Sequence, residues 1–155
     1  LLAVARACPD MDFHVYGARV VDASLGVQFQ GLNNVFLQGP YASAREVMAA
    51  RAHHAMMFTS RWEGLANVLI EFGALGLPIA AATVGGVGEL IAEETGFPLS
   101  ERPRVEDYVR ALRAIKNAPE DAARRSERLL ALIGERHSRA HFADAVARIP
   151  GYLHT

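Results

Sequence analysis

Short apolar runs alternate with longer helical patterns along this chain, and this alternation limits the possible folds more than any other feature. One run, Ile79 to Ala82, contains no polar residue, which is typical of a strand that is buried on both faces. Strands separated by helices pair in parallel through right-handed crossovers. The sequence therefore predicts an α/β domain with a Rossmann-like parallel sheet flanked by helices, whose strands we expect at 12–16, 34–38, 55–59, 79–82 and 96–99.

The helices are marked by their start and stop signals. Ser43 and Glu46 have the spacing of a capping box at the start of a helix that runs to about His53. Gly76 and Pro78 are a stop signal for the helix that begins near Asn67. A short helix is expected from about Glu89, and the other helices at 1–6, 105–116, 119–135 and 138–148.

Composition excludes several classes of function. With 155 residues, the chain has room for one domain, 1–155. The net charge of -1 argues against nucleic-acid binding, which depends on an excess of Lys and Arg. The single cysteine, Cys8, excludes an internal disulfide and fits a reducing compartment. No apolar run reaches the roughly 18 residues of a membrane span, so we expect a cytoplasmic domain.

Three loops follow strand ends and carry glycine or acidic residues: 17–19, 61–67 and 85–89. Ligands of open parallel sheets bind at this edge, beyond the carboxyl ends of the strands. In the second loop, Gly64 lets a ligand approach the backbone, and the first turn of the next helix offers free amides to a phosphate. The sequence predicts an anion-binding crevice there.

Two glutamates frame this loop. Glu63 precedes Gly64, and Glu71 lies eight positions later, within the helix. Apolar residues surround Glu71, so we expect its carboxylate to need a partner or a ligand hydroxyl. Either glutamate alone is more often structural than functional, but the pair around a glycine loop favours binding of a polyhydroxyl ligand.

The stretch from Thr59 to Glu89, TSRWEGLANVLIEFGALGLPIAAATVGGVGE, resembles the signature of retaining GT-B glycosyltransferases of the group 1, or family 4, type. That family has a Glu-x7-Glu motif, an EG-[FL]-x-[GN] loop, a G-x-P-[VI] turn and a GG-x-x-E loop, and all four occur here in order. Ala66 stands where the family often has proline. The resemblance implies the carboxy-terminal, donor-binding domain of such an enzyme.

The resemblance also implies roles for individual residues. Glu63 would be the catalytic residue, hydrogen-bonding the donor sugar, and Glu71 would bind the ribose of the nucleotide. Trp62 either lines the sugar pocket or packs within its loop. The sugar and diphosphate would be held by Gly17, Gly64, Leu65, Ala66 and Asn67, the base would face Gly39, Pro40 and Tyr41, and the floor of the site would consist of Gly85, Gly86 and Glu89.

No metal and no cofactor are expected, because the sequence contains no evident cluster of metal ligands: the adjacent His53 and His54 would point apart on a helix and are interpreted as surface or packing residues. The expected partners are a nucleotide-sugar, with UDP favoured, and a glycan or lipid acceptor that an amino-terminal domain would bind. The complete enzyme is expected in the cytoplasm or at the inner face of the membrane. Two alternatives remain open: a GT-B-type sugar-nucleotide epimerase or phosphorylase, and a non-catalytic Rossmann-like binding module.

The resemblance further implies that the first strand of the domain, and the Arg and Lys that follow it, are missing from these residues. In a sheet of order 3-2-1-4-5-6 that strand is central, so a gap is expected between the strands near Phe13 and Met57. We expect the gap to be closed by rearrangement, by an upstream segment or by a second copy. The isolated chain is expected to self-associate, to bind nucleotide-sugar weakly and to lack activity.

Overall fold

The computed structural model describes residues 1–17, 29 and 31–151. Its described strands form two parallel sheets, one of order β1-β2 and one of order β3-β4-β5. Each strand lies within one residue of its expected position, and β4 is buried along its whole length as its composition predicts. The strands are β1 (Phe13–Tyr16), β2 (Val35–Gly39), β3 (Met56–Phe58), β4 (Ile79–Ala82) and β5 (Phe97–Leu99).

The helices also follow the expected order, with two corrections. The helix after Ser43 ends at Ala50 and not near His53. The helix expected from Glu89 is a 3₁₀ helix that begins earlier and ends there, and the Val87 amide donates to the Val84 carbonyl at 3.1 Å. The helices are α1 (Leu2–Ala7), α3 (Ala44–Ala50), α4 (Asn67–Gly73), η1 (Gly85–Glu89), α5 (Val105–Asn117), α6 (Pro119–Arg136) and α7 (Arg139–Ala147).

The α3 cap confirms the reading of Ser43 and extends it. The Glu46 amide donates to Ser43 Oγ at 3.2 Å, as in a capping box. The Glu46 carboxylate accepts from the amide of Ala42, at 2.8 Å, and not from that of Ser43 itself. The two bonds fix the point at which the chain leaves β2 and enters α3.

The split between the two sheets falls between β1 and β3, where the sequence places a gap. The two strands do not pair with each other, so in the described residues rearrangement does not close the gap, and that alternative is wrong. Helices on both faces hold the half-sheets together instead. Phe13 and Met57 share one apolar cluster with α1 and α5, and Tyr16 and Met56 share another with α3 and α4.

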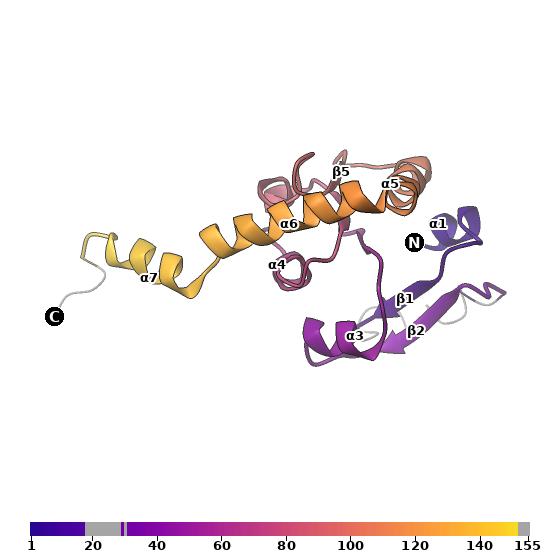
Figure 1. The fold of residues 1–155 in the computed structure, drawn as a ribbon, viewed down its shortest axis with the longest axis horizontal. Helices are drawn as coiled ribbons and strands as arrows, with labels where there is room; N and C mark the ends of the chain where they lie inside the picture. Colours follow the sequence, from indigo (N-terminus) through magenta and orange to yellow (C-terminus); the bar gives the residue numbers. More distant parts are fainter. Residues whose placement is uncertain (18–28, 30, 152–155) are drawn as a thin grey trace.

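The long helix α6 covers the sheet of β3, β4 and β5, and α7 continues away from the body of the molecule (Figure 1). None of the α7 side chains is buried, and Phe142 is 68% exposed. Such an exposed aromatic group is in keeping with the expected self-association, which stays a prediction. Among the described residues, no helix combines the length and the apolar character that crossing a membrane requires.

Asn34 connects three segments at the start of β2. The nitrogen of its buried side-chain amide lies 3.0 Å from the carbonyl oxygens of Ala5, Cys8 and Met11, so its two hydrogens are shared among three acceptors. These bonds satisfy backbone carbonyls at the end of α1 and in the turn that leads into β1.

We expect Asn34→Ala to lower the free energy of unfolding by about 1–3 kcal/mol, because buried carbonyls lose their donor. Urea unfolding measures this loss, with Asn33→Ala at the exposed neighbouring position as the control. Equal midpoints for the two variants would contradict the role of the Asn34 side chain.

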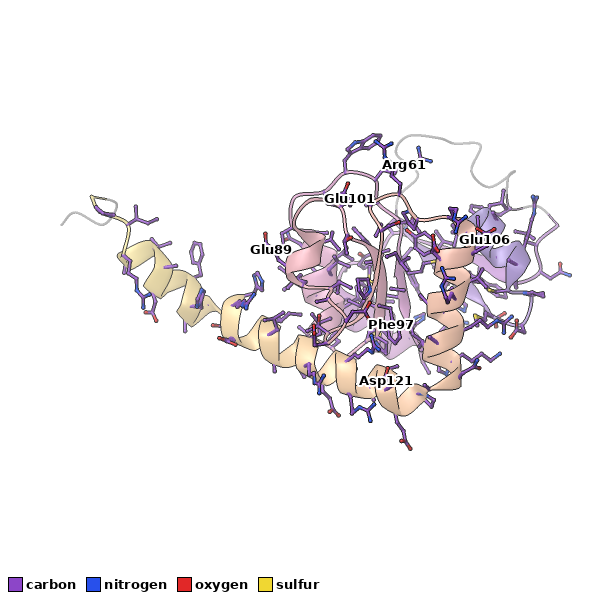
Figure 2. The ribbon with its side chains drawn as sticks, turned by 90° about the horizontal axis from the view of Figure 1, so that it is seen from above. Arg61, Glu89, Phe97, Glu101, Glu106 and Asp121 are labelled. Carbon is purple, nitrogen blue, oxygen red and sulfur yellow. The ribbon has the colours of Figure 1, made fainter. Side chains whose placement is uncertain are left out.

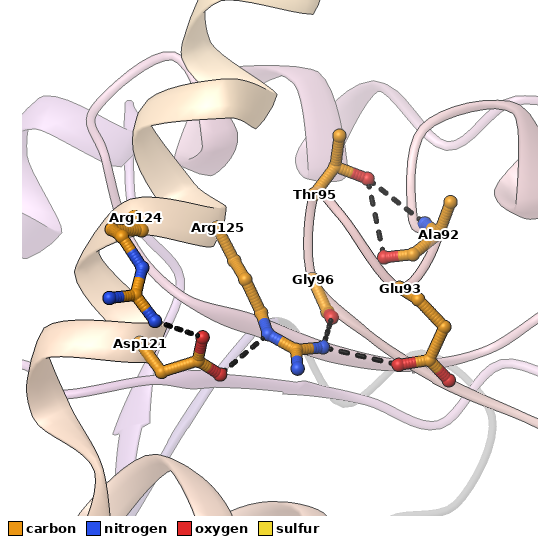
Figure 3. Close-up of polar contacts among 7 residues, drawn as sticks. All are labelled: Ala92, Glu93, Thr95, Gly96, Asp121, Arg124 and Arg125. Atoms are coloured by element: carbon orange, nitrogen blue, oxygen red, sulfur yellow. Dashed lines mark hydrogen bonds and ion pairs between the residues drawn. The ribbon is translucent and has the colours of Figure 1, made fainter.

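Arg125 joins α6 to the segment before β5 (Figure 3). Its guanidinium donates to Asp121 at 2.8 Å, to the Gly96 carbonyl at 2.9 Å and to Glu93 at 3.2 Å. It also lies 4.6 Å from the ring centre of Phe97. The side chain is only 23% exposed, so these contacts are largely screened from water.

We expect Arg125→Met to cost about 1–2 kcal/mol, because a charge-assisted bond to a backbone carbonyl and a cation–π contact are lost together. Arg124 is the matched control, since it lies one residue earlier and forms only an exposed ion pair with Asp121. Arg124→Met should therefore change stability by less than about 0.5 kcal/mol. Thermal unfolding of both variants measures the difference, and a loss of the same size in both would count against the network.

Candidate functional site

The carboxyl ends of β3, β4 and β5 meet at one end of the molecule. Figure 2 shows Arg61, Glu89 and Glu101 at that end and Asp121 at the opposite one. The loops that leave β3 and β4 are the two in which the sequence predicts most of the site. Their position agrees with the general rule that ligands of parallel sheets bind at this edge.

Two of the predicted loops are in direct contact. The Gly86 amide donates to the Gly64 carbonyl at 2.8 Å. Gly85 lies so close to the other loop that a side-chain Cβ there would stand 1.9 Å from the Glu63 carbonyl oxygen. Its φ of +54° also belongs to the left-handed region. The backbone of Glu63 and Gly64 is therefore held against Gly85 and Gly86, and the role of these glycines as the floor of the site stays a prediction.

The three predicted carboxylates differ in their surroundings. Glu63 is half-buried, whereas Glu71 and Glu89 are exposed. Phe72 turns into the core and leaves Glu71 on the solvent side of α4, where water can satisfy its carboxylate without a protein partner. None of the three is in an ion pair with another described residue; the acids that form ion pairs within the described part of the chain are Asp10, Glu93, Asp107 and Asp121.

The start of α4 presents its backbone to the same edge. Its first-turn amides receive no cap from the side chain of Ala66, which is buried in the core with Leu69. Gly64 is exposed, and no atom of the described chain lies within 4 Å of where its Cβ would be. Space for a ligand therefore exists beside Gly64. Ala66 and the half-buried Leu65 attach the loop to the apolar core.

A second group of predicted residues lies beyond β1 and β2. The Gly17 amide donates to the Gly39 carbonyl at 2.9 Å, and Gly39 has a φ of +80° that favours glycine. Tyr41 packs edge-on against Tyr16 and against Phe72 of α4, with ring centres 5.9 and 6.4 Å apart. Tyr41 thus links this group to the helix that carries Glu71. Pro40, which lies between Gly39 and Tyr41 in the chain, is exposed. Positions 18 and 19 of the first loop lie outside the described residues.

The histidines near this edge act as packing residues. His53 lies 3.3 Å from the Tyr16 hydroxyl, and its ring meets His14 edge-on. Burial lowers the pKa of both imidazoles, helped by the nearby Arg51 guanidinium. In the ranges that the structure describes, no three metal-ligating side chains come together.

Trp62 does not pack within its loop, because 84% of its surface is exposed. Its backbone carbonyl accepts a bond from Ser60 Oγ at 3.2 Å, which shapes the loop without covering the ring. Of the two roles open to Trp62 in the sequence, loop packing is therefore excluded. Trp62 immediately precedes Glu63 in the loop that leaves β3, and its indole is open to solvent.

Solved structures of glycosyltransferases have the same fold. HepE from Anabaena, solved in complex with UDP, aligns with a TM-score of 0.84 and 22% identity over 97% of this chain and 43% of its own. Sucrose-phosphate synthase from Thermosynechococcus elongatus aligns at 0.79 and 19% identity, over 96% and 40%. The carboxy-terminal domain of LpcC, a group 1 glycosyl transferase from Francisella tularensis, aligns at 0.71 and 18% identity, over 89% and 77%.

This chain thus spans less than half of HepE and of sucrose-phosphate synthase. No curated protein sequence matches it. The architecture is that of the Rossmann-like carboxy-terminal domain of GT-B enzymes, as the sequence predicts. The family model for Glycosyl transferases group 1 matches residues 1–131, which is most of the chain. This chain therefore belongs to the group 1 family of glycosyl transferases.

Proposed function

We propose that residues 1–155 are the donor-binding half of a retaining glycosyltransferase of the hexosyltransferase type. The complete enzyme would move a sugar from a UDP-sugar to a glycan or lipid-linked acceptor in polysaccharide biosynthesis. The acceptor would bind to an amino-terminal domain, in the cytoplasm or at the inner face of the membrane. The observation that carries the proposal is the contact between the Glu63–Gly64 and Gly85–Gly86 loops, which fixes a half-buried carboxylate at the carboxyl edge of the sheet.

Each group at this edge has a task in binding the donor. Glu63 accepts hydrogen bonds from sugar hydroxyls, and Gly64 to Asn67 offer amides to the diphosphate. Glu71, exposed one turn into α4, accepts from the ribose hydroxyls. The base lies against Gly39, Pro40 and Tyr41, which Phe72 connects to α4. HepE has also been solved with UDP-glucose, which supports UDP as the nucleotide.

The reaction needs little covalent chemistry from the protein. The leaving diphosphate and an oxocarbenium-like sugar must be held in place and stabilised, which is positioning and electrostatic work. A second catalytic carboxylate, as in glycosidases, is not required when the sugar is transferred on one face. No metal or cofactor is assigned a role in this proposal. Because most of the length of HepE lies outside the matched region, we expect residues 1–155 alone to lack transferase activity.

Two variants of the complete protein separate sugar binding from nucleotide binding. Glu63→Gln should weaken UDP-glucose binding roughly ten- to a hundredfold and leave UDP binding unchanged, because only the sugar loses a charged acceptor. Glu71→Gln should weaken both ligands by a similar factor, because they share the ribose. Glu94→Gln, at an exposed position before β5, is the control and should alter neither.

Calorimetric titration of the three variants with UDP and with UDP-glucose gives six affinities to compare with those of the wild type. Wild-type affinity in both glutamate variants would favour the non-catalytic binding module. A thermal-shift series with UDP-, GDP- and ADP-sugars tests the choice of nucleotide, and a preference for GDP- or ADP-sugars would overturn it. Product analysis with the preferred donor distinguishes transfer from epimerisation.

A further inference from the structure

Trp62 is the most exposed of the large apolar side chains in the part of the chain that the structure describes. Its exposed fraction is 84%, compared with 68% for Phe142 and 49% for Ile149. Tryptophan is highly buried on average in folded proteins, so an indole in water calls for an explanation. The loop that carries it does reach the core, because Ala66 is buried there and Leu65 packs against it. This loop therefore turns a small residue inward and its largest residue outward.

The backbone on both sides of Trp62 is fixed, whereas its ring has no partner. Ser60 Oγ donates to the Trp62 carbonyl at 3.2 Å, and the Gly64 carbonyl accepts from the Gly86 amide at 2.8 Å. Within the described residues, the indole takes part in no hydrogen bond, ring contact or cation–π contact. The loop thus holds an open aromatic face at a defined place.

The neighbourhood of Glu63 decides which substrates pass close to Trp62. The Cα atoms of the two residues are about 3.8 Å apart, as in any trans peptide. In the proposed function Glu63 holds the donor sugar, and the acceptor hydroxyl must approach the anomeric carbon of that sugar to about 3–3.5 Å. The acceptor unit that carries this hydroxyl therefore lies beside the same loop.

Burial separates the places of the two sugars. Glu63 is half-buried, and the amides of Gly64 to Asn67 belong to the domain itself, so a donor bound by them lies against the body of the domain. A residue in the wall of that pocket would be partly covered by its neighbours, since such sites are concave. Trp62 is not covered, and its indole projects into solvent. It is therefore open to the substrate that arrives from the solvent side.

Two nearby loops supply polar groups of the kind that a sugar site needs. A pyranose presents C–H groups on its faces and hydroxyls around its rim, and an indole offers an apolar face with one N–H at its edge. Figure 2 shows Arg61 and Glu101 at the same end of the molecule. Neither forms an ion pair with another described residue. The guanidinium can donate to sugar hydroxyls and the carboxylate can accept from them.

We propose that Trp62 binds the acceptor, with its indole stacked on the pyranose unit that receives the transferred sugar. This assignment rests on the proposed function, because it requires a donor sugar at Glu63. It makes the acceptor a glycan that ends in a pyranose, free or joined to a lipid, and the ring is the part that Trp62 recognises. It differs from a place in the donor pocket and from a contact with an amino-terminal domain.

Kinetics of the complete protein test the stacking. UDP release from UDP-glucose is measured with maltose, with octyl glucoside and with water alone as the acceptor. Trp62→Ala should raise the acceptor KM roughly ten- to fiftyfold for both saccharides and leave hydrolysis and UDP-glucose affinity unchanged. Trp62→Phe should stay within about threefold of the wild type. Trp62→Leu, which is apolar but has no aromatic face, should resemble Trp62→Ala.

The other results overturn the assignment in ways that can be told apart. An unchanged acceptor KM in Trp62→Ala would exclude the contact, and a loss confined to octyl glucoside would place the indole on the alkyl chain. Weaker UDP-glucose binding in Trp62→Ala would return Trp62 to the donor pocket. A lowered thermal midpoint that Trp62→Leu restores would indicate a contact with an amino-terminal domain. Wild-type protein that does not bind UDP-glucose would instead refute the proposed function.

Fluorine NMR observes the contact without turnover. The complete protein is labelled with 5-fluorotryptophan, and the Trp62 signal is the one that is missing from Trp62→Phe. With UDP bound, maltose and octyl glucoside should each shift this signal in a saturable way. Sorbitol, an open-chain polyol without a ring to stack, is the control and should not shift it. Absence of a shift with both saccharides would overturn the proposal whether or not the protein turns over.

Discussion

Replacing Gly85 by alanine is expected to lower the free energy of unfolding by about 2–5 kcal/mol and to weaken donor binding at the same time. The added Cβ would stand 1.9 Å from the Glu63 carbonyl oxygen, so one of the two loops must move. Forcing atoms into a filled space costs about 1–3 kcal/mol. The left-handed backbone at φ +54° adds about 1–2 kcal/mol for a residue with a side chain.

The loss of binding follows from the same displacement. Moving the loops apart breaks the bond from the Gly86 amide to the Gly64 carbonyl and releases the backbone that carries Glu63. Gly88→Ala is the matched control, because a Cβ at Gly88 meets only Thr83, at an ordinary 3.9 Å. Urea unfolding and UDP-glucose titration of both variants in the complete protein give the comparison. If Gly85→Ala matched Gly88→Ala in both measurements, the contact between the loops would have no role.

The second large effect is expected in the core beneath α4. Leu129 is fully buried in α6, and its side chain lies against the backbone of Gly73 in α4. Leu129→Ala removes this contact and leaves a cavity, which should lower stability by about 2–5 kcal/mol. Leu130→Ala is the control in the same helix, since Leu130 is 44% exposed and should cost less than about 1 kcal/mol.

Urea unfolding gives the loss of stability of both leucine variants. A midpoint for Leu129→Ala equal to that of Leu130→Ala would mean that α6 does not support α4 in the way described. Because α4 carries Glu71, Leu129→Ala should also weaken UDP binding at temperatures close to unfolding, whereas well below unfolding the effect should be small.

Much of this fold is predictable because its signals are local. The apolar run Ile79–Ala82, the capping pair Ser43 and Glu46, and the stop signal at Gly76 each act within a few residues of the chain. Strand and helix boundaries follow from such signals without knowledge of the tertiary structure. The expected gap beside Phe13 is also present, but it rests on the resemblance to GT-B enzymes and on their strand order and not on a local signal.

The features that the sequence did not reveal depend on contacts between distant segments. The Glu71 carboxylate was expected to need a partner or a ligand hydroxyl because its neighbours are apolar, but the helix directs Phe72 inward and Glu71 to solvent. The clash that forbids a side chain at Gly85 arises from Glu63, which is 22 positions away and belongs to another loop. Periodicity carries no information on such an approach, which only packing determines.

The close approach of α4 to α6 has a consequence for how sequences of this type can diverge. A Cβ at Gly73 would lie 2.7 Å from Ile133 Cδ1 and 2.9 Å from Leu129 Cδ2. A larger residue at position 73 would therefore displace the flexible ends of the Ile133 and Leu129 side chains, and how well these two side chains repack decides what position 73 tolerates. Substitutions at the three positions are expected to depend on one another, so the order in which they arise in a lineage alters the stability of the intermediate sequences.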